Sequence, residues 1–275
     1  MIAVRAPDHL GDAVMALGAI TALSRLAPVE VWTRGRWGQE LYGDVAARVH
    51  AGDGPPAEAA PAVLFKPSWH AAWQWRGLPT VGVGPRGLLG VALPEREEHR
   101  RERYARIAMA AGATDVATSS YSSRGNSPPV PPGHVGLNPW SPSPTVRWPR
   151  FRALADRLEA EGHAVVVYCG PGEVAEVSAQ MGRAAVAGLS LPDFAAALDR
   201  CAAFVSNDSG AAHFAAACGR PVVVVHGSTA PALTGTGRAV VGEPLWCQPC
   251  YRKTCFWGRP CLDRVSVDAV IAALG

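Results

Sequence analysis

The sequence lacks any apolar run near the roughly 20 residues that a membrane-spanning helix needs, although 48% of its residues are hydrophobic. Met1–Arg5 has the pattern of a strand and lacks the basic region, apolar core and cleavage site of a signal peptide. Lysine is almost absent, with only Lys66 and Lys253, and charges of both signs are spread along the chain. The missing spanning helix and signal peptide lead us to expect a cytoplasmic protein. The missing concentrated basic face argues against a nucleic-acid partner.

Motifs of several enzyme classes are also missing. The first expected strand is not followed by the GxGxxG fingerprint of dinucleotide-binding folds, and the chain contains no P-loop. Neither the HExxH motif of zinc proteases nor the GxSxG elbow of α/β-hydrolases occurs. These absences argue against nicotinamide-dependent redox chemistry, P-loop NTP hydrolysis and α/β-hydrolase chemistry.

The 275 residues are enough for two lobes of roughly 130 residues, an ordinary domain size. In the second half, Val-rich runs alternate with segments whose apolar residues recur at helical spacing. Continuous apolar strands with helices between them predict a parallel sheet covered on both faces. The strands expected here are Val135–Leu137, Ala164–Cys169, Ala203–Ser206 and Pro221–His226, and the helices are Phe151–Gly162, Leu191–Arg200, Ser209–Cys218 and Val267–Leu274.

The first half repeats this alternation with weaker signals. Thr118–Gly133 is dense in Ser, Pro and Gly and is the expected linker. We therefore predict an α/β protein of two Rossmann-like domains, residues 1–130 and 131–275. In the first domain the expected strands are Ile2–Arg5, Val29–Thr33 and Ala62–Phe65, the expected helices are Asp12–Arg25 and Glu97–Ala111, and Gly82–Gly90 is an expected loop.

The segment Pro7–Asp12 connects the first strand to the first helix. Gly11 permits a tight turn, and Asp12 then lies at the helix N-terminus, where free N–H groups and the helix dipole favour a carboxylate. Asp12 could simply cap the helix, which is the commoner role of such a residue. Alternatively, it could be a general base that takes a proton from an acceptor hydroxyl. Because parallel α/β sheets bind ligands beyond the carboxyl ends of their strands, Asp12 and the loops described next are expected to share one cleft.

A second loop, Asn138–Pro149, carries Ser141, Ser143 and Arg147 after a strand. Hydroxyl groups and a fixed guanidinium in a proline-stiffened loop can bind a diphosphate. An ordinary surface loop is the alternative.

A third loop, Ser206–His213, leaves a strand and opens a helix with small residues, so that its backbone N–H groups could bind an anion. Asp208 could accept hydrogen bonds from sugar hydroxyls, or Asp208 or Ser209 could simply cap the helix. His213 could point into the cleft or be a hydrogen-bonded core histidine. The turn Gly170–Glu173 places a carboxylate where ribose hydroxyls often bind, although Glu173 could equally open a helix without a ligand.

Segments spread over nearly the whole chain resemble the motifs of one family, in the order in which that family has them. They are Arg5 with Leu10–Val14, Lys66–Ala72, His99–Gly112, Asn138–Pro149 ending in Arg147-Trp148-Pro149, Gly170–Glu173, Ser206–His213 with Pro221 and His226–Thr229, and the tail Cys247–Leu262. On these residues the chain resembles glycosyltransferase family 9, the ADP-heptose:lipopolysaccharide heptosyltransferases.

The resemblance implies a GT-B fold, in which two Rossmann-like domains with parallel sheets face each other across a cleft. It also implies an inverting, metal-independent sugar transfer, with Asp12 as the catalytic base and Arg147 stabilising the diphosphate, which gains negative charge as it leaves. The last helix could pack back on the N-terminal domain. The residues implied for the donor are Asn138, Ser141, Ser143, Arg147, Gly170, Glu173, Asp208, Ser209, Gly210 and His213, and those implied for the acceptor are His9, Lys66, Ser68 and Trp69.

The chain departs from the family in the domain expected to bind the acceptor. It is short there, and Pro7-Asp8-His9 stands where the family has small hydroxyl residues. ADP-heptose is the favoured donor and a GDP-sugar the alternative, while the acceptor could be lipopolysaccharide core or a small natural product. A lipid acceptor would bring peripheral membrane contact. Two other functions stay open: a catalytically silent nucleotide-sugar-binding protein, and a GT-B nucleotide-sugar epimerase.

Seven cysteines divide into two groups. Cys169, Cys201 and Cys218 lie in apolar stretches and are expected in the core. Reduced thiols in a structural loop are favoured for the other four, because their spacing matches a zinc-ligand pattern imperfectly and a disulfide is least expected in a reducing compartment. Zinc stays the alternative, and no other cofactor is expected. These four residues are Cys247, Cys250, Cys255 and Cys261.

Overall fold

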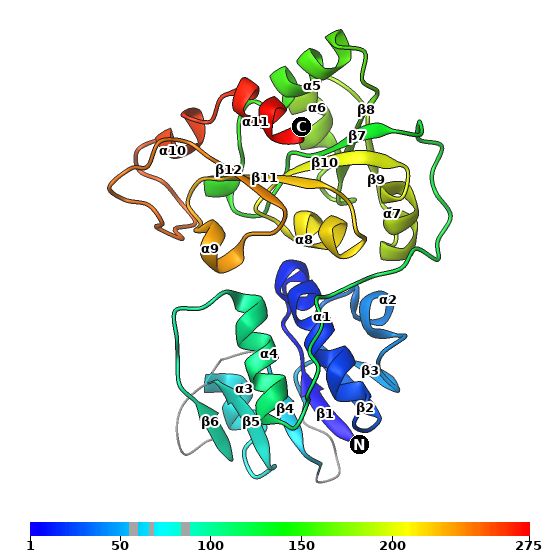
Figure 1. Cartoon of the computed structure of the whole chain (residues 1–275), viewed down its shortest axis with the longest axis vertical. Helices are drawn as coiled ribbons and strands as arrows, with labels where there is room; N and C mark the ends of the chain where they lie inside the picture. Colours follow the sequence, from blue (N-terminus) through cyan, green and yellow to red (C-terminus); the bar gives the residue numbers. More distant parts are fainter. Residues whose placement is uncertain (55–59, 66–68, 84–88) are drawn as a thin grey trace. The chain divides into compact units, whose positions relative to one another are not determined.

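The computed structural model describes residues 1–54, 60–65, 69–83 and 89–275. The chain divides into two compact units, Met1–Ser120 and Tyr121–Gly275. Among the described residues, each unit holds one six-stranded sheet whose paired strands all run parallel (Figure 1). The predicted α/β class with two parallel sheets is thus confirmed.

The N-terminal unit combines its sheet with helices of very different length. Its strands are β1 (Ile2–Arg5), β2 (Val29–Thr33), β3 (Arg48–Ala51), β4 (Ala62–Leu64), β5 (Thr80–Val83) and β6 (Val91–Leu93). Its helices are α1 (Leu10–Ser24), α2 (Gly38–Tyr42), α3 (Trp69–Gln74) and α4 (Arg100–Ala110).

The C-terminal unit is built in the same alternating way. Its strands are β7 (His134–Asn138), β8 (Val165–Cys169), β9 (Ala185–Ala187), β10 (Cys201–Asn207), β11 (Val222–His226) and β12 (Arg238–Val241). Its helices are the 3₁₀ turn η1 (Pro144–Val146), α5 (Phe151–Ala160), α6 (Val174–Met181), α7 (Leu191–Leu198), α8 (Gly210–Ala217), α9 (Pro231–Thr234), α10 (Pro260–Asp263) and α11 (Val267–Leu274).

Both sheets have the doubly wound strand order of a Rossmann fold. The order is β3-β2-β1-β4-β5-β6 in the first unit and β12-β11-β10-β7-β8-β9 in the second, so the winding reverses between β1 and β4 and between β7 and β10. Ligands of such sheets bind outside the carboxyl ends of the strands at these reversals. The loops that follow β1, β7 and β10 therefore occupy the positions where a ligand is expected.

The cores explain why these segments form these elements. In α5, Phe151, Leu154, Ala155 and Leu158 are buried, and their spacing of three and four residues puts them on one helix face. All five residues of β11 are buried, as expected for a β-branched strand covered on both faces. In the part of the chain that the structure describes, no helix is both long and apolar enough to cross a bilayer.

The boundary between the units falls at Ser120/Tyr121 instead of the predicted 130/131. Contacts of the linker explain the difference. Tyr121 donates its backbone N–H to Ala217 O at 2.9 Å, and its ring lies 4.9 Å from that of Phe214. Asn126 N donates to the Asp193 carboxylate at 2.8 Å. The later part of the linker therefore packs on the C-terminal unit.

The earlier part of the linker packs on α1 at a glycine. A Cβ added to Gly18 would lie 2.2 Å from the carbonyl oxygen of Ala117, a distance that no side chain could tolerate. Gly18 N instead donates to Ser119 Oγ at 3.0 Å. The absence of a side chain at Gly18 is thus what allows the linker to lie against this helix.

Two further expectations need correction. Helix α1 begins at Leu10 instead of Asp12, which places Asp12 inside its first turn. Gly82 and Val83 belong to β5 and not to a loop, because Gly82 pairs with Leu64 and with Ala92; residues 84–88 of that expected loop lie outside the described residues.

The final helix α11 packs within the C-terminal unit, with Val270 fully buried in its core.

Candidate functional site

The loop after β1 is fixed by a buried arginine. Arg5, the last residue of β1, has no exposed surface. Its guanidinium donates to Asp8 Oδ1 at 2.7 Å and also pairs with Asp53, which Arg34 contacts from the other side. A buried guanidinium needs such carboxylate partners. The network holds the backbone of the loop that leads to Asp12.

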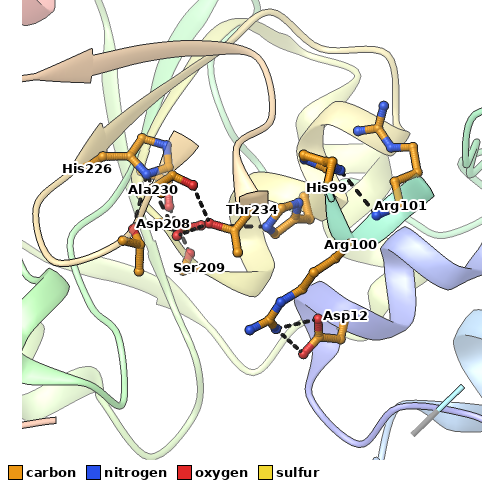
Figure 2. Close-up of polar contacts among 12 residues, drawn as sticks. Asp12, His99, Arg100, Arg101, Asp208, Ser209, His226, Ala230 and Thr234 are labelled. Atoms are coloured by element: carbon orange, nitrogen blue, oxygen red, sulfur yellow. Dashed lines mark hydrogen bonds and ion pairs between the residues drawn. The ribbon is translucent and has the colours of Figure 1, made fainter. Parts of the chain in front are cut away.

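Asp12 lies in the first turn of α1 and faces α4, as Figure 2 shows. Arg100 Nη1 lies 2.7 Å from Asp12 Oδ1 and 2.8 Å from Oδ2. The Tyr104 hydroxyl donates to Asp12 Oδ1 at 3.1 Å. The residue that precedes the helix as its N-cap is His9. The simple capping role weighed for Asp12 is therefore not what holds its carboxylate.

This arrangement leaves proton-accepting capacity on one carboxylate oxygen. Burial raises the pKa of Tyr104 well above its ordinary value, so its hydroxyl stays protonated and donates to Asp12. Oδ1 accepts from both Arg100 and Tyr104, while Oδ2 accepts from Arg100. Each carboxylate oxygen can accept about two hydrogen bonds. A hydroxyl that approaches Oδ2 can thus donate to it while α4 keeps the carboxylate oriented.

The structure describes His9 and Trp69, two of the four residues expected to contact the acceptor. His9 is exposed, and within the described part of the chain its side chain makes no capping hydrogen bond. Trp69 begins α3 with 72% of its surface exposed. Lys66 and Ser68 lie outside the described residues. His9 and Trp69 both belong to the N-terminal unit.

In the C-terminal unit, Asn138 joins the ends of three strands. It is the last residue of β7, and its Nδ2 donates to Tyr168 O in β8 at 3.0 Å. Its Oδ1 accepts from the hydroxyls of Ser206 and Ser209, each at 3.5 Å. These bonds tie the loop after β7 to the loop after β10 at the winding reversal.

Arg147 is held at the edge of the same loop. Its Nε donates to Ser141 O at 2.5 Å, and its guanidinium carbon lies 4.7 Å from the centre of the Trp140 ring. Glu176, in the first turn of α6, pairs with Arg147 and accepts from Trp140 Nε1 at 2.8 Å. The hydrogen bond from Trp140 and the charge of Arg147 lower the pKa of Glu176. An anion that binds Arg147 must share the guanidinium with Glu176.

Ser143 belongs to the same loop as Arg147, and Glu173 belongs to the turn after the neighbouring strand β8. Ser143 Oγ lies 2.9 Å from Thr145 Oγ1, and Ser143 N donates to Ser141 Oγ at 3.4 Å. Glu173 folds its carboxylate back onto the backbone N–H of Gly170. In this state the Glu173 side chain closes its own turn, and Glu173 occupies the N-cap position of α6.

Asp208 lies in a buried polar cluster after β10 (Figure 2). Thr234 Oγ1 donates to its Oδ2 at 2.9 Å, His213 Nε2 lies 3.7 Å from Oδ1, and His226 Nδ1 lies 3.8 Å from Oδ2. Ser209, and not Asp208, is the N-cap residue of α8, which begins at Gly210. Burial raises the pKa of Asp208, but His213 and His226 outweigh burial and hold this pKa below its ordinary value.

The sequence profile of Glycosyltransferase family 9 (heptosyltransferase) matches residues 97–259. This match covers more than half of the chain. The protein belongs to glycosyltransferase family 9. Over 134 residues it is 36% identical to Lipopolysaccharide heptosyltransferase 1 of Pseudomonas aeruginosa, an alignment that covers 45% of this chain and 38% of that protein. The matched region thus spans well under half of the relative's length.

Solved structures extend the likeness to the whole fold. Escherichia coli ADP-heptose LPS heptosyltransferase II superposes with a TM-score of 0.75 at 20% identity, covering 99% of this chain and 98% of that one. A family 9 glycosyltransferase from Veillonella parvula superposes with a TM-score of 0.76 at 19% identity, covering 99% and 95%. At these identities the likeness shows the fold, which is the GT-B fold of two Rossmann-like domains.

The matched residues 97–259 of this family 9 protein include only part of the candidate site. The match includes Arg147, Asp208 and also Arg100, but it begins after Asp12. The sequence had not singled out Arg100, Tyr104, Glu176 or His226 as site residues. An arginine at the start of a helix is unremarkable by itself, and only the fold places α4 beside α1.

Among the described residues, no three His, Cys, Asp or Glu side chains are grouped so that they could hold a metal ion. Cys247, Cys250, Cys255 and Cys261 are all free thiols. Burial raises the pKa of Cys261, and the nearby thiols Cys255 and Cys250 raise it further.

The unfolding free energy of this family 9 protein is expected to depend on pH because of His226. Burial lowers the pKa of His226, and its Nε2 has no hydrogen-bond partner in the described part of the chain. The unfolded state, in which His226 has its ordinary pKa of about 6.5, therefore takes up a proton first as the pH falls. The unfolding free energy should decrease from about pH 7.5 towards the lowered folded pKa, by up to ~1.4 kcal/mol per pH unit from this group.

Denaturant titrations at several pH values test this expectation. His226→Gln should show a shallower decrease between pH 7.5 and 5 than the wild type, although His134, whose pKa burial also lowers, will leave part of the slope. His163→Gln, a change at an exposed histidine, is the matched control. Equal slopes for the wild type and His226→Gln would contradict the expected protonation.

Proposed function

We propose that this protein is an inverting, metal-independent glycosyltransferase that moves a heptose or related sugar from a nucleotide diphosphate to an acceptor hydroxyl. ADP-heptose is the favoured donor, and a GDP-sugar is the alternative. The observation that carries the proposal is the position of Arg147 and Asp208, on loops that leave the neighbouring strands β7 and β10 at the winding reversal of the C-terminal sheet. Family membership supplies the class of reaction.

The donor chemistry needs a cation and hydrogen-bond donors near the diphosphate. As the bond from the sugar to the diphosphate breaks, negative charge builds up on the leaving group, and a fixed cation there lowers the barrier. Arg147 can supply that charge permanently, because an arginine is not deprotonated in proteins. Backbone N–H groups of Ser209 and Gly210, at the start of α8, can add hydrogen bonds. This set of groups is the reason for proposing transfer without a metal ion.

Asp208 is proposed to bind hydroxyl groups of the sugar. It is almost fully buried and ionised at neutral pH because its pKa is lowered. A carboxylate that stays charged in a buried cluster is a strong hydrogen-bond acceptor. The donor pocket would be completed by Asn138, Ser141, Ser143 and His213. Glu173 would turn to the ribose once a donor binds.

Asp12 is proposed as the base of the transfer. In an inverting mechanism the acceptor oxygen attacks the anomeric carbon on the face opposite the leaving group, and its proton must go to a base. Asp12 Oδ2 can take that proton while Tyr104 and Arg100 hold the carboxylate. The acceptor would meet His9, Lys66, Ser68 and Trp69 of the N-terminal unit. It would be lipopolysaccharide core or a small natural product, and a lipid-linked acceptor would bring the protein to a membrane surface.

A thermal-shift panel tests the donor assignment. A ligand present at 100 times its Kd stabilises the folded state by about 2.7 kcal/mol, so the true nucleotide should raise Tm clearly. We expect ADP, or else GDP, to raise Tm more than UDP or AMP, with no change when EDTA is added. If none of the nucleoside diphosphates raises Tm, the donor proposal is wrong.

One observation favours a second candidate. The Asp12 carboxylate is paired with Arg100 and bonded by Tyr104, and an acceptor that failed to reach Oδ2 would leave a protein that binds a nucleotide-sugar without transferring it. Mass spectrometry after incubation with an acceptor panel detects transfer and donor hydrolysis, and proton NMR of the donor incubated alone detects an isomer of unchanged mass. Transfer or donor hydrolysis would exclude a silent binder, whereas an isomerised donor formed without acceptor would indicate an epimerase.

A further inference from the structure

The cysteine-rich tail, residues 245–259, contacts the loop after β7, which carries Arg147, and the loop after β11. On one side it meets the loop after β11: Gln248 Nε2 donates to Gly227 O at 2.7 Å, and the backbone N–H groups of Cys250 and Tyr251 each donate to Ser228 O at 3.0 Å. The N–H of Ala230 donates to the Tyr251 hydroxyl at 3.3 Å. The tail is thus bonded to the loop that follows His226.

On its other side the tail meets the loop after β7. Thr145 Oγ1 donates to Arg252 O at 2.5 Å. Arg259 Nη1 donates to Pro144 O at 3.0 Å and to Arg147 O at 3.2 Å. Pro144 is the first residue of the 3₁₀ turn η1 and Arg147 is its C-cap, whose N–H also donates to Pro144 O at 3.2 Å. One guanidinium nitrogen therefore holds both ends of the turn that carries Arg147.

The Arg259 backbone is set for this contact. Arg259 has a φ of 66°, in the left-handed region that few non-glycine residues occupy, and its N–H donates to Cys255 Sγ at 3.3 Å. A residue kept in an unfavourable conformation needs compensating contacts. Here the two carbonyl bonds made by the side chain are such contacts, and they end on the turn of Arg147.

We propose that the tail is a strap that positions the donor site, with Arg259 as the positioning residue for Arg147. This inference rests on the proposed function, because it takes Arg147 as the group that meets the diphosphate. The contacts with Glu176 and Ser141 O hold the Arg147 guanidinium and not its backbone. By holding the carbonyl oxygens at both ends of η1, Arg259 keeps the Arg147 backbone in place before a donor binds. The strap should therefore matter for the phosphates of the nucleotide and little for its base.

Calorimetric titration of the full chain with ADP and with adenosine tests the strap. Loss of two hydrogen bonds in Arg259→Leu should raise the Kd for ADP about tenfold, while the Kd for adenosine changes by less than about twofold. Arg259→Lys should recover part of the loss, because an ammonium group can donate to the same carbonyls. Arg264→Ala is the matched control, since Arg264 is half exposed and pairs with Glu243 at 3.9 Å.

A second measurement needs no ligand. Hydrogen exchange of the peptide that contains residues 141–150 should become faster in Arg259→Leu, because the amides of Val146 and Arg147 donate within the turn that Arg259 holds. If Arg259→Leu does not fold, Thr145→Val removes the bond to Arg252 O instead, together with the contacts to Ser143 and Ser228, and should weaken ADP binding in the same selective way. Ser228→Ala, which keeps the bond to Arg252 O, is its control.

The outcomes separate the two proposals. Equal ADP affinity and equal exchange in the wild type and in the strap variants would overturn the strap, as would a matched loss of ADP and adenosine affinity. A wild type that binds neither ADP nor GDP would overturn the proposed donor, and in that case the exchange measurement alone decides whether Arg259 holds the turn.

Discussion

Asp12→Asn is expected to lower kcat of sugar transfer by about 10²–10⁴-fold, the usual range for the loss of a general base. An amide oxygen can still accept a hydrogen bond from the acceptor hydroxyl, but it cannot take up the proton. Because Asp12 is proposed to act on the acceptor side, the Kd for ADP should stay within about twofold of the wild type. Steady-state kinetics together with calorimetric titration of ADP measure both quantities.

The control for this variant is Asp115→Asn. Asp115 lies in the same unit, is exposed and pairs with Arg25 at 3.8 Å, so that its loss should leave both quantities unchanged. An Asp12→Asn enzyme that keeps wild-type kcat would remove Asp12 as the base. A variant that loses kcat and ADP affinity in parallel would indicate a structural role for the carboxylate, through its bonds to Arg100 and Tyr104.

Arg147→Ala is expected to affect both binding and turnover. Loss of one charge-stabilising group at a developing anion typically costs about 10²–10³-fold in kcat, and the missing cation should also raise the Kd for ADP. Removing Arg147 also frees the Glu176 carboxylate from its partner, which would repel the diphosphate further. The measurements are the donor dependence of the initial rate and the titration of ADP.

Two matched variants sharpen this prediction. Arg157→Ala removes an exposed arginine of α5 that pairs with Glu161 and should behave as the wild type. Arg147→Ala combined with Glu176→Gln should bind ADP more tightly than Arg147→Ala, because the uncompensated carboxylate is gone. If Arg147→Ala binds ADP and turns over as the wild type does, the donor site lies elsewhere.

The sequence predicted the long, regular elements and missed the short ones. The bounds of β1, β2 and α11 agree with the structure because their apolar residues or caps are clear; Ser266, for example, accepts from Ala269 N as the N-cap of α11. The edge strands β3, β6, β9 and β12 were missed. Each has three or four residues that are mostly exposed or half-buried, so the continuous apolar run that marks a buried strand is absent. The internal strand β5 was missed as well, because its last two residues were assigned to the glycine-rich loop.

The residue types of the site were predictable, but their partners were not. Asp12, Arg147 and Asp208 follow strands, and that local pattern pointed to them. Arg100 lies 88 residues after Asp12, and Thr234 lies 26 residues after Asp208. Contacts at such separations depend on how helices pack on the sheet, and no local spacing in the sequence encodes that packing.

The strap also has a practical consequence, because Lys253 is exposed on it and the sequence contains only one other lysine, Lys66. In a Lys66→Arg variant, the α-amino group can first be blocked near pH 7, because the pKa of an α-amino group, ordinarily about 8, lies below that of lysine. An amine-reactive dye applied afterwards above pH 8 would then label a single side chain. That fluorophore would sit on a segment hydrogen-bonded to the loops after β7 and β11, the first of which carries Arg147. An arginine-rich protein thereby offers an almost unique attachment point for an optical reporter of substrate capture.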